Sequence, residues 1–346
     1  MVTVRRLGIL LLLFNALGSV SWAQSSDDAK RCAETSNPDL AIHHCTAAIQ
    51  SGRLSEADLE TAFNNRGKAY MRKGDYDRAI QDYDQAIRLK PDYALAFNNR
   101  GIAYGRKGDY DRAIQDHDEA IRLKPDDAGV FYNRGITYND KGDHDRAIQD
   151  YDQAIRLKPD YADAFNNRGN AYRRKGDYDR AIQDYDQAIR LEPKSATRLR
   201  ARGITRFCLM RFAAAQEDFV LALQLDPTDP YSVIWLYLAR ARNGQDARTD
   251  LEKKAAGLKL TDWPGRIIEL YLGRASKAVL SAAKDSNPKK DENKRCEAYF
   301  FLGEYALLQG NAVDAALLFR EAIATGATNN LAYSGAQAEL KHLTPE

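Results

Sequence analysis

Asparagine side chains recur at one fixed spacing in this sequence, within the segments FNNRGKAY, FNNRGIAY, FYNRGITY and FNNRGNAY. A primary amide both donates and accepts hydrogen bonds, so a row of amides can hold the backbone of an extended peptide without selecting its side chains. Asparagine is also a poor helix former, about 0.7 kcal/mol worse than alanine. The amides in question are Asn65, Asn99, Asn133 and Asn167, preceded in three of the four segments by Asn64, Asn98 and Asn166.

The sequence contains no catalytic constellation beside these amides. It has no glycine-rich phosphate loop, no G-x-S-x-G motif and no H-E-x-x-H motif. Its five histidines are scattered, and His117 and His144 stand where the equivalent segments have tyrosine. The run His43–Cys45 leaves a metal site open as a minor alternative. We therefore expect no enzymatic activity, no cofactor and no metal.

The first 23 residues have the features of a secretory signal peptide. Arg5 and Arg6 precede the apolar run LGILLLLFNALGSV, and small residues precede an expected cleavage site between Ala23 and Gln24. An uncleaved anchor is the alternative, although the run is short for a spanning helix. No cysteine directly follows the cleavage site, so lipid attachment is not indicated. We expect a periplasmic or secreted protein.

Charge and hydropathy argue against two classes of partner. The formal net charge of the 346 residues is +2, and removing the signal segment with Arg5 and Arg6 brings it to 0. A chain without net charge has no general attraction to nucleic acid or to anionic lipid. No segment after the signal is apolar enough to cross a membrane.

The spacing of the asparagines belongs to a 34-residue period that runs through much of the chain. Within each period, apolar residues recur every three or four positions in two blocks, as in two amphipathic helices. A KGD turn or its equivalent separates the blocks, and proline ends the unit because it cannot continue a helix. The period is marked by Gly67, Gly101, Gly135, Gly169 and Gly203, by Ala79, Ala113, Ala147, Ala181 and Ala215, and by Pro91, Pro125, Pro159, Pro193 and Pro227.

This order of aromatic, glycine, tyrosine, alanine and proline positions resembles the tetratricopeptide-repeat (TPR) family. The resemblance implies an all-α fold, a TPR superhelix or α-solenoid of antiparallel helix pairs. One pair cannot bury its own apolar face, so neighbouring pairs must stack. Gly67 and Ala79 are small where the two helices of a pair approach closely, and Phe63, Tyr70 and Tyr83 fill the space between them.

We expect four parts after the signal segment. A degenerate helical hairpin comes first and five repeats follow, the fifth with Met210 and Arg211 in place of the Gly-Asp turn. A helical region without the period then leads to a terminal TPR-like repeat and a capping helix near Leu331–Leu343. The signal segment and the four parts are residues 1–23, 24–59, 60–229, 230–295 and 296–346.

The last third of the chain carries a second resemblance. The segments DPYSVIWLYLARA, WPGRIIELYLGRAS and AYFFLGEYALLQGNAVDAALLFREAI resemble the corresponding part of the bacterial NlpI-type TPR lipoproteins. Those proteins are periplasmic, homodimeric adaptors that bring a processing protease and peptidoglycan hydrolases together. The resemblance implies an envelope adaptor and leaves a homodimer open. This chain lacks the lipidation cysteine of that family, which puts its membrane attachment and its partners in question.

Two sets of residues predict contacts inside the fold. If the N-terminal hairpin follows the repeat, Cys32 and Cys45 take inward-facing positions, and export permits a disulfide between them; two free buried thiols are the alternative. Two charged positions keep the 34-residue step and both become leucine in the terminal repeat, at Leu302 and Leu318. We therefore expect contact between the arginines Arg66, Arg100, Arg134, Arg168 and Arg202 and the aspartates Asp82, Asp116, Asp150, Asp184 and Asp218.

In a TPR superhelix the first helix of each repeat lines the concave groove, where these asparagines would lie. The pattern resembles the asparagine ladder in the TPR superhelix of O-linked N-acetylglucosamine transferases, which grips peptide backbone. Because the repeats are nearly identical, a structural role remains open, in which the amides bond to neighbouring helices. The other groove residues that we expect to contact a peptide are Lys68, Arg72, Arg106, Asn139, Asn170 and Arg173.

The sequence thus predicts a non-enzymatic scaffold or adaptor of the cell envelope that binds a protein or an extended peptide, but no nucleic acid. The C-terminal resemblance implies that it recruits envelope proteases or peptidoglycan hydrolases. The alternative is a module that binds a glycan or another small molecule, such as a cell-wall fragment, in the tyrosine-rich groove.

Overall fold

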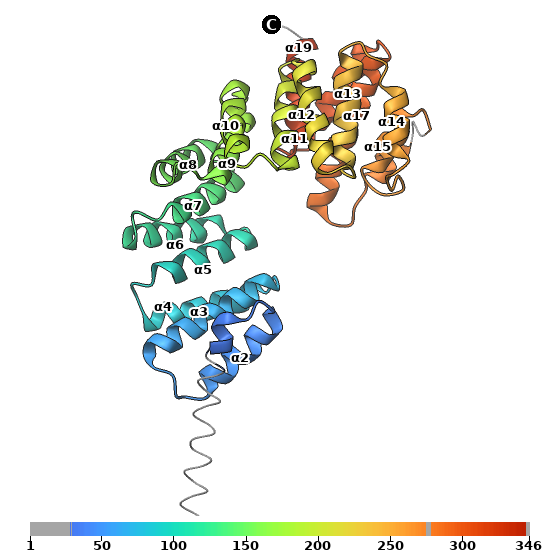
Figure 1. Ribbon diagram of the computed structural model, residues 1–346. Coiled ribbons are helices and arrows are strands. Elements are labelled where there is room, and N and C mark those ends of the chain that lie inside the picture. The colour runs from blue at the N-terminus through green and yellow to red at the C-terminus, as the bar shows by residue number, and fades with distance from the viewer. Residues whose placement is uncertain (1–27, 29, 275–277, 344–346) are drawn as a thin grey trace, which may run out of the picture. The chain divides into compact units, whose positions relative to one another are not determined.

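Helices joined by short turns make up the described part of the chain, and no β-strand occurs in it (Figure 1). The computed structural model describes residues 28, 30–274 and 278–343. The signal segment expected at residues 1–23 lies outside the described residues. The chain divides into two compact units, Met1–Asp143 and His144–Glu346.

In the first unit, each helix packs against the helix that follows it in the chain. After a short helical stretch at residues 30–34, α2 forms the expected N-terminal hairpin. The first helices of three successive repeats are α3, α5 and α7, and α4 and α6 are the second helices of the first two. The bounds are α2 Pro38–Gln50, α3 Glu56–Arg72, α4 Tyr76–Leu89, α5 Ala94–Lys107, α6 Tyr110–Leu123 and α7 Ala128–Lys141.

The second unit continues with paired helices and then loses the regular alternation. The regular part is α8 His144–Leu157, α9 Ala162–Arg174, α10 Tyr178–Leu191, α11 Ala196–Cys208, α12 Phe212–Leu225 and α13 Pro230–Arg242. Three short helices follow: α14 Arg248–Ala255, α15 Gly265–Tyr271 and α16 Ala278–Ala282. The chain ends in α17 Pro288–Leu308, α18 Ala312–Ala324 and α19 Leu331–Leu343.

The turn inside each repeat requires a left-handed residue. Gly74 has φ +75° between α3 and α4, and the Asp75 side chain then accepts the Arg78 backbone N–H at 3.3 Å to begin α4. The fifth repeat keeps the turn without the glycine, because Met210 adopts φ +56°. A non-glycine residue at positive φ is strained, so the fold imposes this turn on an unfavourable residue.

Repeats in both units close their helix pair on a contact between a glycine and an aromatic ring. A Cβ atom on Gly67 would lie 2.7 Å from Tyr83 Cε1, which is shorter than any real contact of that kind. In the terminal repeat, a Cβ on Gly303 would lie 2.6 Å from Phe319 Cε1. Glycine is therefore required here for close approach and not for backbone freedom.

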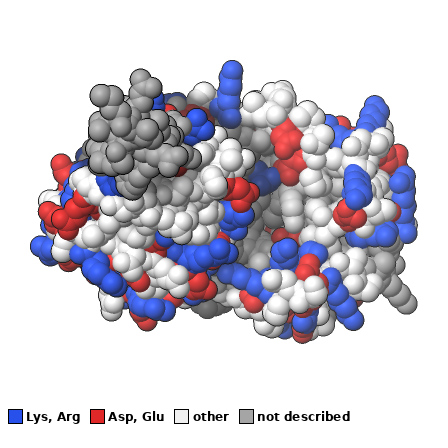
Figure 2. All heavy atoms as spheres, turned by 90° about the horizontal axis from the view of Figure 1, so that it is seen from below, with Lys and Arg blue, Asp and Glu red and all other residues white. Residues whose placement is uncertain are grey.

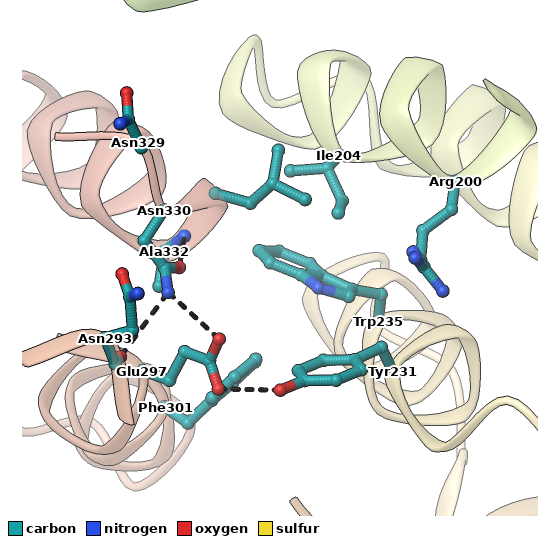
Figure 3. Close-up of a pocket in the computed structure, with 11 residues that line it drawn as sticks. Arg200, Ile204, Tyr231, Trp235, Asn293, Glu297, Phe301, Asn329, Asn330 and Ala332 are labelled. Carbon is teal, nitrogen blue, oxygen red and sulfur yellow. Dashed lines mark hydrogen bonds between the residues drawn. The ribbon is translucent and has the colours of Figure 1, made fainter. Parts of the chain in front are cut away.

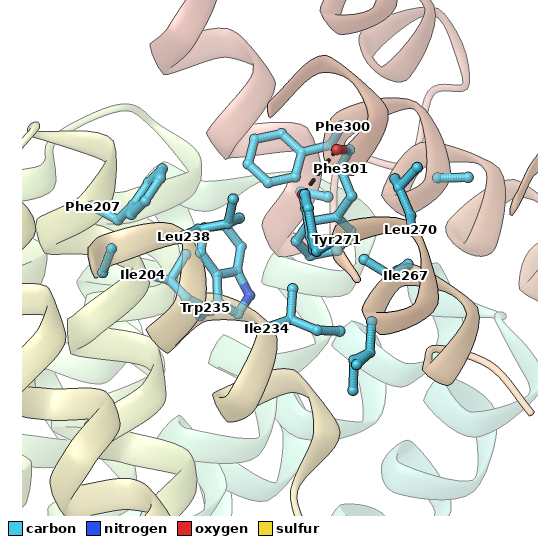
Figure 4. Packing of buried hydrophobic residues seen from close by; sticks show 14 of the residues in the cluster. Ile204, Phe207, Ile234, Trp235, Leu238, Ile267, Leu270, Tyr271, Phe300 and Phe301 are labelled. Atoms are coloured by element: carbon cyan, nitrogen blue, oxygen red, sulfur yellow. Dashed lines mark hydrogen bonds between the residues drawn. The ribbon is translucent and has the colours of Figure 1, made fainter. Parts of the chain in front are cut away.

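An aromatic cluster forms the core of the second unit (Figure 4). Trp235 of α13 is 2% exposed and lies with its ring centroid 5.1 Å from Phe207, 5.3 Å from Phe300 and 5.6 Å from Phe301. The Tyr271 hydroxyl of α15 donates to the Phe301 carbonyl at 2.9 Å. These contacts join α11, α13, α15 and α17, which explains how the region without the period still packs.

The start of one helix in this unit differs from the sequence-based expectation. Helix α17 begins at Pro288, eight residues before the expected repeat boundary at Cys296, because Asn287 caps it by accepting the Lys290 N–H at 3.1 Å. The capping helix α19 packs on α17 and α18, and it also contacts α11.

The predicted bond between Cys32 and Cys45 is confirmed, since these two residues form a disulfide. Both side chains are buried with Ala62 of α3. The link ties the stretch at residues 30–34 to α2, the least regular hairpin of the unit. Cys208 and Cys296 are free and buried.

The predicted contact between the arginine and aspartate positions is also confirmed for Arg66, Arg100, Arg168 and Arg202. Arg100 Nε lies 2.8 Å from Asp116 Oδ2, and Arg100 Nη2 lies 2.6 Å from Asp116 Oδ1. Arg100 Nη1 also reaches Asp84 at 2.5 Å, and Asp84 belongs to α4, the second helix of the preceding repeat. Each such arginine therefore joins the two helices of its own repeat and the second helix of the repeat before.

Replacing these partners should give an asymmetric double-mutant cycle. Asp116 is 6% exposed, so Arg100→Leu strands a buried carboxylate and should cost about 3–5 kcal/mol in unfolding free energy. Asp116→Leu should cost less, because Arg100 keeps Asp84. The double variant should cost less than the sum of the two single changes by about 1–3 kcal/mol. Urea denaturation measures all three.

The matched control is the exposed pair Arg100 and Asp84, whose aspartate side chain is 41% exposed. Its coupling energy should stay below about 1 kcal/mol. Additive losses for Arg100→Leu and Asp116→Leu would contradict the coupling.

Candidate functional site

The asparagines of the first unit form hydrogen bonds from one repeat to the next. Asn99 Nδ2 of α5 donates to Asn64 Oδ1 of α3 at 3.0 Å, and Asn133 Nδ2 of α7 donates to Asn98 Oδ1 of α5 at 3.0 Å. Asn64 and Asn98 are buried, at 2% and 9% exposure. The structural role that the sequence left open is therefore present, and these bonds help to align α3, α5 and α7.

Part of the hydrogen-bonding capacity of the same row remains unused. Asn65, Asn99 and Asn133 are half-buried. Among the residues that the structure describes, the Asn65 side chain has no hydrogen-bond partner, and the amide oxygens of Asn99 and Asn133 accept no hydrogen bond. We call the surface of α3, α5 and α7 that carries these three residues the groove face. It can accept hydrogen bonds from backbone N–H groups of a peptide, and at Asn65 it can also donate one.

In the second unit, the equivalent amides bond mainly to one another. Asn167 Oδ1 accepts from Asn166 Nδ2 at 3.3 Å and from Asn170 Nδ2 at 3.4 Å. Asn170 Oδ1 in turn accepts the Tyr185 hydroxyl at 2.8 Å. These amides have less capacity left for a ligand than those of the groove face.

Helix α19 covers the neighbouring position on α9. Arg173 is 2% exposed, and its Nη1 donates to Ser334 Oγ at 2.7 Å. The Tyr178 hydroxyl donates to the Ser334 carbonyl at 3.3 Å. The sequence placed Arg173 in an open groove because the 34-residue period carries no information on where the last helix packs.

The remaining predicted groove residues differ in exposure. Lys68, Arg72 and Arg106 are exposed, and Arg72 Nη1 donates to the Ser36 carbonyl at 2.7 Å. Asn139 is buried, at 8% exposure. On the molecular face of Figure 2, basic and acidic side chains are interspersed. Three cations of the first unit therefore stay accessible, while Asn139 is enclosed.

His117 of α6 takes the place that tyrosine holds in three other repeats. It is fully buried against Gly101, and neither ring nitrogen has a hydrogen-bond partner. Burial, assisted by the charge of Arg134, lowers the pKa of His117 from 6.5 to about 3. A cavity of about 90 Å³ beside it is lined by Asn133 and Thr137, which leaves room for a larger ring.

A buried charged cluster in the second unit is structural. Arg242 Nη1 lies 2.8 Å from Glu304 Oε2 and 3.0 Å from Glu339 Oε1, and the guanidinium also lies over the Phe212 ring. Burial and the neighbouring Glu339 raise the pKa of Glu304 well above its usual range, while Arg242 opposes them. Glu304 is fully buried, so these groups join α13, α17 and α19 and have no access to a substrate.

The histidines near the N-terminus have partners within the fold. His44 Nδ1 lies 2.8 Å from Asp28 Oδ1, and Cys45 is in the disulfide. Across the described ranges, no group of three or more His, Cys, Asp and Glu side chains is arranged to hold a metal ion. None of the helices described combines the length and hydrophobicity that a bilayer-spanning segment needs.

A cavity that the sequence did not indicate lies in the second unit, between α11, α13, α17 and the start of α19 (Figure 3). Its volume is about 370 Å³. Its walls combine apolar side chains, including Trp235 and Phe301, with the carboxylate of Glu297. No periodic pattern marks these residues, because they come from helices of different repeats.

Comparison with known families identifies the repeat. The TPR repeat matches residues 67–108 and 136–176, and two forms of the tetratricopeptide repeat match residues 94–127 and 162–195 and residues 270–330. Together these matches cover more than half of the chain. The chain belongs to the TPR family.

A curated relative and two solved structures add detail to this assignment. The chain is 35% identical over 139 residues to a lipoprotein NlpI homologue of Haemophilus influenzae, covering 39% of this chain and 44% of that protein. A TPR protein from Parabacteroides merdae superposes with a TM-score of 0.53 at 18% identity, over 81% of this chain and 98% of that one. PilW, described as a type IV pilus biogenesis factor, gives 0.52 at 18%, over 57% and 93%. Both structures share the fold.

The asparagines of the groove face should differ in their effect on stability. Asn65→Ala removes no hydrogen bond and improves helix propensity, so the unfolding free energy should hold or rise by up to about 0.7 kcal/mol. Asn99→Ala leaves the buried Asn64 amide without its donor and should lower it by about 1–2 kcal/mol. Urea denaturation compares the two. Equal shifts for both variants would show that the bond between Asn99 and Asn64 contributes nothing.

His117 should make stability depend on pH. The unfolded chain binds a proton at His117 near pH 6.5, whereas the folded chain stays neutral until about pH 3. Stability is therefore lost as pH falls below about 6.5, by up to about 1.4 kcal/mol per pH unit. Between pH 7 and pH 5, His117→Tyr and His117→Phe should each gain about 2 kcal/mol over the wild type. A difference from wild type that is constant with pH would refute the assignment.

Proposed function

We propose that this TPR protein is a non-enzymatic scaffold of the cell envelope that binds proteins or extended peptides on the groove face. The observation that carries the proposal is the row of Asn65, Asn99 and Asn133, whose remaining hydrogen-bonding groups are half-buried and unused. Unused amide oxygens at successive repeats match the backbone N–H groups of an extended chain. Lys68, Arg72 and Arg106 would add contacts to acidic side chains or to a terminal carboxylate.

The envelope location is part of the proposal. The N-terminal sequence has the features of a secretory signal, and the disulfide between Cys32 and Cys45 is favoured in an oxidising compartment. The similarity to an NlpI-type lipoprotein over 39% of the chain supports the finer proposal that the partners are envelope proteases or peptidoglycan hydrolases. A homodimer of this chain is compatible with that role.

The test begins with partner capture from an envelope extract, followed by calorimetry with a synthetic peptide from the captured partner. Asn65→Ala should weaken binding roughly two- to tenfold without loss of stability, because one hydrogen bond to the ligand backbone disappears. Gln81→Ala is the matched control, since it removes an exposed amide from the second helix of the same repeat. The control variant should bind as the wild type does.

If Asn65→Ala and Gln81→Ala both bind the peptide with wild-type affinity, the groove face is not the binding site. A rise in melting temperature with cell-wall muropeptides but with no captured peptide would favour a glycan-binding module instead.

A further inference from the structure

The cavity of the second unit contains a carboxylate that forms no ion pair with any residue the structure describes. Glu297 Oε2 accepts the Tyr231 hydroxyl at 2.9 Å and Trp263 Nε1 at 2.6 Å. Glu297 Oε1 accepts Asn330 Nδ2 at 3.0 Å. Tyr231 and Asn330 are drawn with Glu297 in Figure 3. All three donors are neutral, so they orient the carboxylate in the half-buried site without compensating its charge.

The one basic side chain among the residues that line this cavity does not supply the missing charge. Arg200 forms an ion pair with Asp229, whose side chain is 10% exposed. Arg200 and Asp229 balance each other's formal charge, so neither supplies a counter-charge to the carboxylate of Glu297. Burial and then the charge of Glu297 raise the pKa of Tyr231, as expected beside an uncompensated carboxylate.

The remaining acceptor capacity of Glu297 is narrow. A carboxylate offers about four acceptor positions, and Oε2 already accepts two donors whereas Oε1 accepts one. An arginine ligand would need both oxygens for a bidentate contact. A single compact cation that approaches Oε1 fits the free position better.

The other walls are apolar. Trp235, Phe301, Ile204 and Leu331 line the space in front of the carboxylate. Its volume of about 370 Å³ is large enough for one long side chain with the adjoining backbone. Trp235, Phe301 and Ile204 are at most 2% exposed, so an aliphatic stem would contact Leu331 and Tyr231, which line the same space and are half-buried.

We propose that this cavity binds a lysine side chain of a peptide, with the ammonium on Glu297 Oε1 and the four-carbon stem against Tyr231 and Leu331. The inference rests on the proposed function in that the ligand is a peptide, but the site belongs to the second unit and uses none of the asparagines of the groove face.

The test uses the full chain and four blocked pentapeptides with glycine on both sides of one central residue. The central residue is lysine, norleucine, arginine or glutamate, and norleucine keeps the aliphatic stem but lacks the ammonium. The probe is the ¹⁵N–¹H signal of the Trp263 indole, which donates to Glu297 and is assigned with Trp263→Phe. Lysine should shift this signal and bind about tenfold more tightly than norleucine.

Variants then locate the contact. Glu297→Gln should abolish the preference for lysine over norleucine, and Glu321→Gln, an exposed carboxylate on α18, should leave it unchanged. Equal binding of lysine and norleucine by the unaltered protein, or tighter binding of arginine or glutamate, would overturn the proposal without any variant. Asn65→Ala should leave the shift of the Trp263 indole signal by the lysine peptide unchanged, because Asn65 lies on the groove face and not in the cavity. The proposal for the cavity and the proposal for the groove face can therefore fail independently.

Discussion

The contact between a glycine on the first helix and an aromatic ring on the second governs the geometry of each repeat. Tyr83 lies so close to Gly67 that no side chain could be placed there. The arginine directly precedes this glycine, and the asparagines precede the arginine. Because the glycine fixes the rotation of the first helix, it also determines that Arg66 meets Asp82 and that Asn64 lies under the next repeat.

The amides of the groove face combine two roles within the same side chain. The nitrogen of Asn99 holds the preceding repeat, and its oxygen is available for the peptide that we propose as the ligand. A residue without an amide at position 99 would lose both the bond to Asn64 and the unused oxygen. A longer amide would not keep the bond to Asn64 in the same place. The hydrogen bond between Asn99 and Asn64 therefore offsets part of the helix stability that asparagine loses relative to alanine. Ligand binding need not offset the whole of that loss.

Sequence reasoning succeeded where a signal repeats or where two positions change together. The helix pairs, the contact of Arg100 with Asp116 and the link between Cys32 and Cys45 are of this kind. It could not find contacts that occur once, since these depend on packing between distant segments. The cover of α19 over Arg173 and the grouping of Glu297 with Tyr231 belong to that class.

Three kinds of polar contact in the first unit reach one repeat back, and each keeps a constant separation along the chain. Asn133 bonds to a residue 35 positions earlier, Arg134 to one 16 earlier and Lys141 to one 30 earlier, as Asn99, Arg100 and Lys107 do in the repeat before. Removing residues 94–127 would bring Asn133 to Asn64 and Arg134 to Asp84, and every donor would meet the same kind of acceptor. The number of repeats is thus free to change by gene duplication or deletion without a new interface, and the length of the array becomes a quantity that selection can adjust.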